Sequence, residues 1–180
     1  MNNFTFIFGG ARSGKSSHAV KMAKALKKKT AFIATCTFKD GEMKRRIGLH
    51  KKSRPQSWKI IEEGVDLKRE LLKLESKYKV ILIDCLGLFV SNLMEKNLTE
   101  PAINKEIKAL TDTILKVKAN IIVVSNDVGS GIIPDNKLAR TFRDLLGFAN
   151  QQMAKKADNV IFMQVGIPNI LKGGKDGFIK

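Results

Sequence analysis

The sequence has few cysteines, few aromatic residues and no long apolar run, and each scarcity argues against a class of protein. Its two cysteines, Cys36 and Cys85, lie far apart and neither has a C-x-x-C partner, so neither a disulfide framework nor a zinc motif is indicated. We expect both to be small buried residues in a reducing compartment. Aromatic residues make up only 7% of the chain, and the motifs of common nucleic-acid-binding domains are missing, so we predict no nucleic-acid partner.

No apolar stretch approaches the roughly 20 residues that a membrane-spanning helix needs. The apolar run at residues 4–8 is also too short for the core of a signal peptide, and no basic segment precedes it. From the sequence we therefore predict no stable membrane insertion and a location in the cytoplasm.

Positive charge is what the chain has in excess. Its 180 residues, enough for one domain with a real core, include 33 Lys and Arg but only 17 Asp and Glu, a net charge of +16. Such an excess fits nucleic acid, an acidic membrane surface or polyphosphate ligands. Lysine runs such as 27–29 fall at the ends of expected helices, where cations suit the helix dipole. We therefore interpret much of the charge as solvated surface.

The most informative motif is a glycine-rich loop between an apolar run and a helical segment. It fits the pattern G-x-x-x-x-G-K-[ST], whose backbone N–H groups converge on the phosphates of a nucleoside triphosphate. Lys15 would neutralise the β- and γ-phosphates, and the Ser16 hydroxyl would hold Mg²⁺. The alternative is a glycine-rich turn without a ligand. The loop comprises Gly9, Gly10, Ala11, Arg12, Ser13, Gly14, Lys15 and Ser16.

Short apolar runs alternate with helical patterns along the chain, which is typical of α/β proteins. Unbroken apolar runs, such as residues 79–84, favour parallel strands that are covered on both faces. We predict one phosphate-loop (P-loop) nucleotide-binding domain over residues 1–180, with a RecA-like, wound and mainly parallel sheet and helices on both faces. Strands are expected at 4–8, 30–34, 58–61, 79–84, 120–125 and 160–165, and helices at 15–28, 65–77, 86–95, 103–117 and 138–153.

Asp84 ends a buried apolar strand downstream of the loop, where a carboxylate holds Mg²⁺ directly or through water in P-loop proteins. The alternative is a carboxylate that only caps the next helix. Ligands of open α/β sheets bind beyond the carboxyl ends of the strands. Thr35, Ser125 and Asn126 also follow strands, so we expect them to line one cleft with Asp84.

A polar and strongly basic segment occupies residues 38–53. Its few apolar residues predict a helix that is only weakly attached to the core and is therefore mobile. His50 lies among cations, which favour the neutral, nucleophilic form of its ring. A lone histidine in a polar helix is more often an ordinary surface residue, and His18, in the helix behind the loop, keeps that interpretation.

Several short motifs recur in a fixed order along the chain. The motifs are the loop at 9–16, Ala34-Thr35, Asp40, Glu42-Met43, Arg46-Ile47, His50, Arg54-Pro55, Trp58, Glu62, Asp84-Cys85-Leu86, Ser91-Asn92-Leu93, the block 124–136, Leu138-Ala139-Arg140, Phe142-Arg143-Asp144, Asn150-Gln151, Ala157-Asp158 and Gly166-Ile167-Pro168. Taken together, they resemble bifunctional adenosylcobinamide kinase/adenosylcobinamide-phosphate guanylyltransferase over roughly residues 4–172.

The resemblance implies two successive transfers in the pathway to cobalamin. The first phosphorylates adenosylcobinamide with ATP or GTP, and the second moves GMP from GTP to the new phosphate. It also implies that His50 carries GMP as a phosphoramidate, with Lys15 as a further catalytic residue, and that the protein is a homo-oligomer, a trimer in this family. Beyond the loop, the implied nucleotide-binding residues are Ala34, Thr35, Cys36, His50, Lys51, Lys52, Ser53, Glu62 and Asp84.

The chain departs from the family pattern at four positions. Asp127 and Asp135 stand where glutamate is usual, which keeps the charge but shortens the reach by one methylene. Ile60 stands where threonine is usual and Gly64 where proline is usual. Both lie beside Glu62, so the residues that flank this implied nucleotide contact differ from the family pattern.

Two other functions remain open from the sequence. One is a small-molecule P-loop kinase without nucleotidyl transfer, which would carry no protein-bound label from GTP. The other is a RecA-like, nucleic-acid-stimulated NTPase, which the net charge of +16 suggests. Binding to DNA or RNA that falls steeply with salt would favour it.

Overall fold

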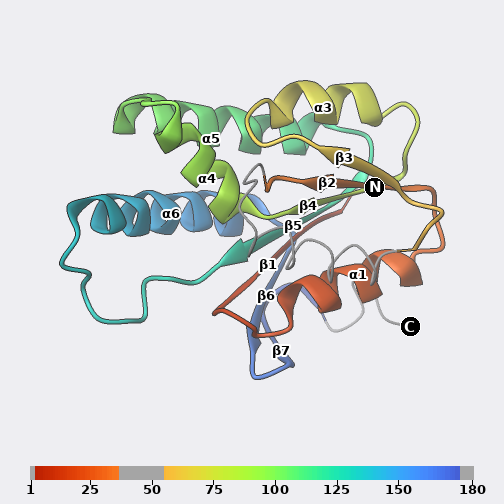
Figure 1. Ribbon diagram of the computed structural model, residues 1–180. Helices are drawn as coiled ribbons and strands as arrows, with labels where there is room; N and C mark the ends of the chain where they lie inside the picture. The colour runs from red at the N-terminus through yellow and green to blue at the C-terminus, as the bar shows by residue number, and fades with distance from the viewer. Residues whose placement is uncertain (1–2, 37–54, 175–180) are drawn as a thin grey trace.

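Five helices and a seven-stranded sheet make up the part of the chain that the computed structural model describes, residues 3–36 and 55–174 (Figure 1). The strands are β1 (Phe4–Gly9), β2 (Thr30–Ala34), β3 (Lys59–Glu62), β4 (Val80–Asp84), β5 (Asn120–Asn126), β6 (Asn159–Gln164) and β7 (Ile167–Lys172). The helices are α1 (Lys15–Ala25), α3 (Leu67–Leu74), α4 (Leu86–Glu95), α5 (Glu100–Lys116) and α6 (Lys137–Lys156).

The sheet has the order β3-β2-β4-β5-β1-β6-β7, and every neighbouring pair except β6 and β7 is parallel. This confirms the predicted wound, mainly parallel α/β sheet. The strand that leads into the phosphate loop, β1, lies between β5 and β6, and β5 separates it from β4. Parallel strands with both faces covered need apolar residues at successive positions, which explains the unbroken apolar runs in the sequence.

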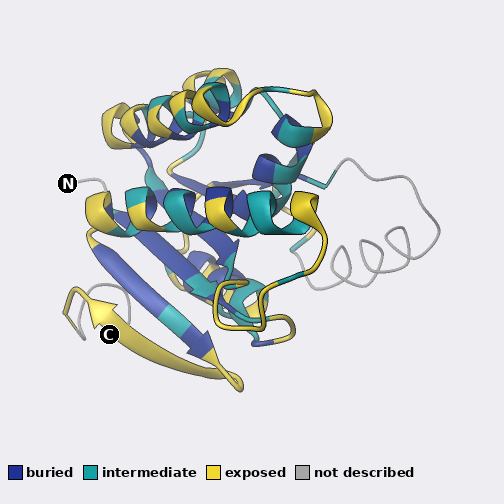
Figure 2. Cartoon of the chain, turned by 90° about the vertical axis from the view of Figure 1, so that its left-hand side faces the viewer, coloured by how far each residue is buried: buried dark blue, intermediate teal, exposed yellow. Residues whose placement is uncertain are grey.

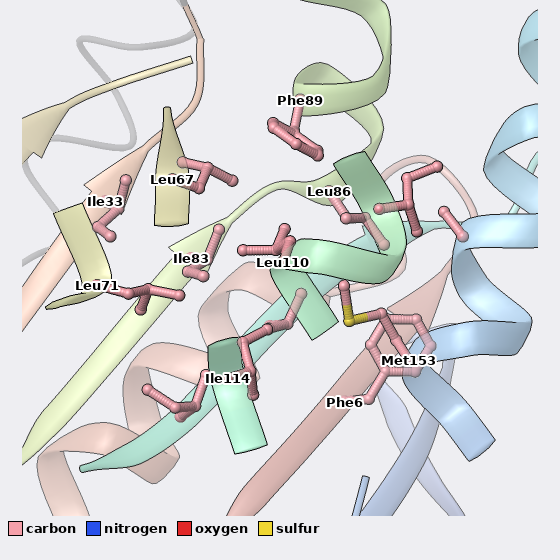
Figure 3. Close-up of a cluster of buried hydrophobic side chains, with 14 of the residues drawn as sticks. Phe6, Ile33, Leu67, Leu71, Ile83, Leu86, Phe89, Leu110, Ile114 and Met153 are labelled. Carbon is pink, nitrogen blue, oxygen red and sulfur yellow. The ribbon is translucent and has the colours of Figure 1, made fainter. Parts of the chain in front are cut away.

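Helices cover both faces of the sheet, as predicted. The helices α3, α4, α5 and α6 pack on one face, where strand residues such as Phe6 and Ile83 meet helix residues such as Leu110 and Met153 (Figure 3). On the other face, α1 packs through Ala19 and Ala23 against alternate strand residues. Figure 1 shows α1 alone on its side of the sheet among the labelled helices. Successive side chains of β1, β2, β4, β5 and β6 therefore serve two separate cores.

Helix ends follow local capping chemistry. The Asp66 carboxylate accepts a hydrogen bond from the Arg69 amide at the start of α3, and the Asn136 side chain accepts one from Ala139 at the start of α6. The helix α5 begins three residues before the predicted position, at Glu100, with a proline in its first turn. No helix in the described part of the chain is both long and apolar enough to cross a membrane.

One strand escaped the sequence prediction. β7 runs antiparallel to β6 at the edge of the sheet, and all six of its residues are exposed (Figure 2). An edge strand without a buried face gives no alternating pattern, so its hydrogen bonds to β6 alone define it. The expectation of two buried cysteines is half right: Cys85 is buried, whereas Cys36 is partly exposed.

The fold requires a residue without a side chain at the end of β1. A methyl group at Gly9 would collide with the Met163 carbonyl oxygen on β6 and lie 2.8 Å from Ser13 Oγ, whereas one at Gly10 would meet no atom within 4 Å. We predict that Gly9→Ala lowers the free energy of unfolding by about 1–3 kcal/mol. Gly10→Ala should change it by less than about 0.5 kcal/mol. Urea unfolding of both variants checks this, and equal losses would contradict it.

Candidate active site

The predicted phosphate loop connects the central strand β1 to α1. Two loop residues, Arg12 (φ 56°) and Gly14 (φ 89°), adopt left-handed backbone conformations, and the Ser13 amide donates to the Gly10 carbonyl at 3.3 Å. The helix α1 starts directly after Gly14 with neither a side-chain cap nor an acidic residue in its first turn. The positive end of α1 is therefore directed at the loop without a competing carboxylate from that turn.

Lys15 lies in this loop with its ammonium group turned back toward the chain. Its Nζ donates to the Gly10 carbonyl at 2.9 Å. Partial burial lowers the pKa of Lys15 below its ordinary value, while the nearby Cys85 and, to a smaller extent, Asp84 oppose that effect. A half-desolvated cation gains strongly from an anionic partner, because burial disfavours its charge unless another charge compensates. A triphosphate in the loop would supply that partner.

Two neighbouring chain segments support the loop through backbone hydrogen bonds. The Asp127 amide, after β5, donates to the Gly9 carbonyl at 2.9 Å, and the Gly166 amide, between β6 and β7, donates to the Ser13 carbonyl at 3.1 Å. Sequence reasoning missed both supports, because a backbone donor leaves no side-chain signature. The one hint in the sequence is Gly166, because a glycine between two apolar runs favours a tight turn. In the structure Val165 and Gly166 both have positive φ, as such a turn requires.

Asp84 ends β4 and is only partly buried, with Ala34 beside it in register on β2. Its charge acts on Lys15, so the structure places these two predicted residues close enough to interact. The adjacent Cys85 follows a cis peptide bond. Burial, reinforced by the Asp84 charge, raises the pKa of Cys85 to about 12. The thiol is therefore neutral at physiological pH and is not a nucleophile.

Two of the four strand-end residues have buried side chains that do not line an open cleft. Thr35 and Ser125 are fully buried, and their hydroxyl groups bond within the fold. The Ser125 hydroxyl donates to Asn150 Oδ1 at 2.6 Å, and Asn150 Nδ2 donates to the Asn126 carbonyl at 3.0 Å. Asn126 itself is partly exposed. Ser125 and Asn150 thus join β5 to α6, whereas the Thr35 hydroxyl bonds the backbone of Cys85.

The other predicted site residues are distributed as follows. Ala34 is buried, Cys36 is partly exposed, and Glu62 is exposed at the end of the neighbouring strand β3. His18 lies partly buried on α1, where burial and then the charge of Lys21 lower its pKa, so its ring is neutral at physiological pH. His50, Lys51, Lys52 and Ser53, like the whole basic segment at 38–53, lie outside the described residues.

Two of the departures from the family pattern have structural accounts. The Asp127 carboxylate accepts hydrogen bonds from the Gly129 amide at 3.1 Å and from the Ser130 hydroxyl at 2.8 Å. Asp135 offers its backbone carbonyl to the Arg140 side chain at 2.6 Å. The short side chain of Asp127 therefore stabilises the turn of its own loop. The contact of Asp135 does not depend on its side chain, because it uses the backbone carbonyl.

The residues present fit a magnesium ion. Ser16 and Asp84 would offer a hydroxyl and a carboxylate, the hard oxygen donors that Mg²⁺ prefers. No group of three or more His, Cys, Asp or Glu side chains that could hold a metal occurs among residues 3–36 and 55–174. This suits Mg²⁺, which is usually held by one or two protein ligands together with substrate phosphates and water.

A glycine loop that leads from a central parallel strand into a helix, with a lysine at its end and a carboxylate on a nearby strand, defines a P-loop NTPase. Comparison with known families makes this class more specific. The chain belongs to the family described as cobinamide kinase/cobinamide phosphate guanyltransferase, whose family model matches residues 5–171.

Similar bacterial proteins carry names that agree with the family. The chain is 36% identical over 167 residues to the bifunctional adenosylcobalamin biosynthesis protein CobP of Pseudomonas aeruginosa, a match that covers 93% of this chain and 96% of that protein. It is 35% identical over 173 residues to the bifunctional adenosylcobalamin biosynthesis protein CobU of Escherichia coli and also to that of Salmonella typhimurium. Each of these matches covers 89% of this chain and 95% of the other protein.

The position of Lys15 generates a prediction. Lys15→Ala should lower turnover by about a hundredfold or more, because it removes the cation that the loop directs at the triphosphate. Lys24→Ala, which removes an exposed lysine from the last turn of the same helix, is the matched control and should leave turnover unchanged. Binding of a fluorescent GTP analogue and steady-state turnover check both variants. Wild-type affinity and turnover in Lys15→Ala would refute the assignment.

Proposed function

We propose that this chain phosphorylates the aminopropanol hydroxyl of adenosylcobinamide with a nucleoside triphosphate. It then transfers GMP from GTP to that phosphate, which releases pyrophosphate and gives adenosylcobinamide-GDP. The observation that carries the proposal is the phosphate loop with Lys15 beside Asp84, in a chain that matches the family over residues 5–171. ATP and GTP would be the nucleotide substrates.

The kinase reaction needs positioning and charge stabilisation and no covalent residue. Backbone N–H groups of the loop and the N-terminus of α1 would hold the phosphate oxygens, and Lys15 would leave the Gly10 carbonyl to pair with them. Ser16 and Asp84 would hold Mg²⁺, which neutralises charge on the β- and γ-phosphates when it is bound. The substrate hydroxyl would attack the γ-phosphorus, breaking its bond to the bridging oxygen of the nucleoside diphosphate.

The second reaction would use His50 as the acceptor of GMP. Its neutral ring nitrogen would attack the α-phosphorus of GTP, forming a P–N bond while the bond to pyrophosphate breaks. A phosphate oxygen of adenosylcobinamide phosphate would then attack the same phosphorus and release the histidine. Lys15 would stabilise the leaving pyrophosphate in the first of these steps. Support for His50 comes from the ordered motifs around it in the sequence.

We further propose that the protein acts in the cytoplasm as a homo-oligomer, a trimer by family resemblance. Exposed aliphatic residues support an interface at the β6–β7 edge of the sheet, since large apolar side chains that gather on a surface mark association sites. They are Val165, Ile167, Ile170 and Leu171, which are 84%, 60%, 49% and 61% exposed.

The proposed metal role of Asp84 predicts a change in magnesium dependence. Asp84→Asn keeps the shape of the side chain but removes its charge, so it should raise the Mg²⁺ concentration for half-maximal turnover by about tenfold. Asp112→Asn, which alters an exposed aspartate on α5, should leave the magnesium titration unchanged. An unchanged titration in Asp84→Asn would leave Asp84 with a capping role only.

The guanylyl-histidine is tested by labelling. Incubation with Mg²⁺ and α-labelled GTP should leave label on the denatured protein, whereas γ-labelled GTP should leave none, because pyrophosphate departs with both outer phosphates. A P–N bond is cleaved in acid and survives alkali, which separates it from a seryl ester. The absence of any label in the wild-type protein would favour a P-loop kinase without nucleotidyl transfer.

Two variants assign the labelled residue. His50→Asn should lose the label and the GMP transfer but keep most of the kinase activity, because γ-phosphoryl transfer needs no imidazole. His18→Asn should keep the label. Label that persists in His50→Asn would exclude His50 as the acceptor.

A further inference from the structure

A buried hydrogen-bond network joins the carboxyl ends of β2 and β4, directly behind Asp84. Thr35 makes three of its contacts. Its amide donates to the Asp84 carbonyl at 3.1 Å, its hydroxyl accepts from the Cys85 amide at 2.7 Å, and the same hydroxyl donates to the Cys85 carbonyl at 2.8 Å. Thr35 has no solvent exposure, and Cys85 is only 7% exposed. One threonine therefore holds both polar atoms of the Asp84–Cys85 peptide group and the Cys85 carbonyl as well.

Asn92, on α4, extends the network. Its Nδ2 donates to the Thr35 carbonyl at 2.8 Å and to the Gly64 carbonyl at 2.9 Å. The side chain is almost completely buried, so water cannot replace these bonds cheaply. Asn92 thus holds the backbone carbonyl of Thr35 and links it to Gly64 in the β3–α3 connection. The Gly64 contact uses a backbone carbonyl, which a proline at that position would also offer.

The network surrounds a residue whose side-chain position matters for metal binding. A metal-ligating group has to be held within about 0.5 Å of its working geometry by residues that are themselves locked in place. Asp84 is the last residue of β4, so beyond it the strand ladder no longer constrains the chain. Beyond that point the Thr35 hydroxyl holds the chain in place, because it bonds both the amide and the carbonyl of Cys85.

We propose that Thr35 and Asn92 are positioning residues for the Asp84 carboxylate, and that their hydrogen-bond network sets the affinity of the site for a divalent cation. This inference rests on the proposed role of Asp84 as a metal ligand. It assigns Thr35 a function that does not require its side chain to touch the nucleotide, in agreement with its complete burial. A network that only stabilises the fold would change the free energy of unfolding without changing cation affinity.

The test measures cation binding directly. Mn²⁺ replaces Mg²⁺, and electron paramagnetic resonance of free Mn²⁺ is followed in a titration of the full chain with a non-hydrolysable GTP analogue. Thr35→Val removes the hydroxyl and nearly keeps the shape of the side chain, so we expect about tenfold weaker Mn²⁺ binding, as when outer partners of metal ligands are lost. Thr35→Ser keeps the hydroxyl and should restore binding to within about twofold of the wild type.

Thr111→Val is the matched control. Thr111 is a buried threonine on α5 whose hydroxyl donates to the Ile107 carbonyl at 2.8 Å and to Met153 Sδ at 3.7 Å, so this variant also loses the hydrogen bonds of one buried hydroxyl group. It should lower the urea midpoint and leave Mn²⁺ binding unchanged. Asn92→Ala, which removes both amide contacts and keeps the Thr35 hydroxyl, should weaken Mn²⁺ binding in the same direction as Thr35→Val and serves if that variant does not fold.

The possible results separate the inference from the proposed function. If Asp84→Asn weakens Mn²⁺ binding and Thr35→Val and Asn92→Ala do not, the positioning role is overturned and the metal role of Asp84 stands. If Asp84→Asn leaves Mn²⁺ binding unchanged, the metal role fails and the inference fails with it. Weaker binding in the Thr35 and Asn92 variants, with restoration by Thr35→Ser, supports the inference.

Discussion

The site depends on the position of β1 between β5 and β6. Phe4 to Gly9 pair with β5 along the whole strand, and Thr5 to Gly9 pair with β6, so both edges of β1 are occupied. Both faces are covered by helices, and β1 is almost completely buried. The phosphate loop therefore begins at a rigid point of the molecule. At the end of β1 the chain also approaches β6 so closely that a side chain at Gly9 would meet the Met163 carbonyl.

The order of the strands determines which groups can act together. β5 separates β1 from β4, yet Asp84 still influences Lys15, so the loop cation and the strand carboxylate lie near each other at the carboxyl ends of the strands. Such an arrangement stabilises charge on a polyphosphate without a protein nucleophile, and the raised pKa of Cys85 removes the nearest thiol from the chemistry. For the covalent step we propose His50, on the resemblance of the ordered motifs around it in the sequence.

Motifs whose side chains carry the chemistry could be predicted from the sequence, and so could the apolar strands. The loop residues, Asp84 and six of the seven strands follow from local patterns, because close packing on both faces demands apolar runs. The burial of the Thr35 and Ser125 side chains could not be predicted, since a position at a strand end does not reveal whether the side chain faces solvent or a neighbouring segment. The supports from Asp127 and Gly166 use backbone groups that any residue other than proline provides. The strand β7, exposed throughout, has no buried face from which it could be recognised.

The central claim is that one phosphate loop serves both group transfers. The most direct test measures GMP transfer from GTP to adenosylcobinamide phosphate in the presence of β,γ-imido ATP, whose γ-phosphoryl group the enzyme cannot transfer. We expect the analogue to inhibit GMP transfer competitively with GTP. Its inhibition constant should equal the one measured for the same analogue in the kinase reaction. GMP transfer that continues at its full rate while the analogue blocks the kinase reaction would contradict the claim.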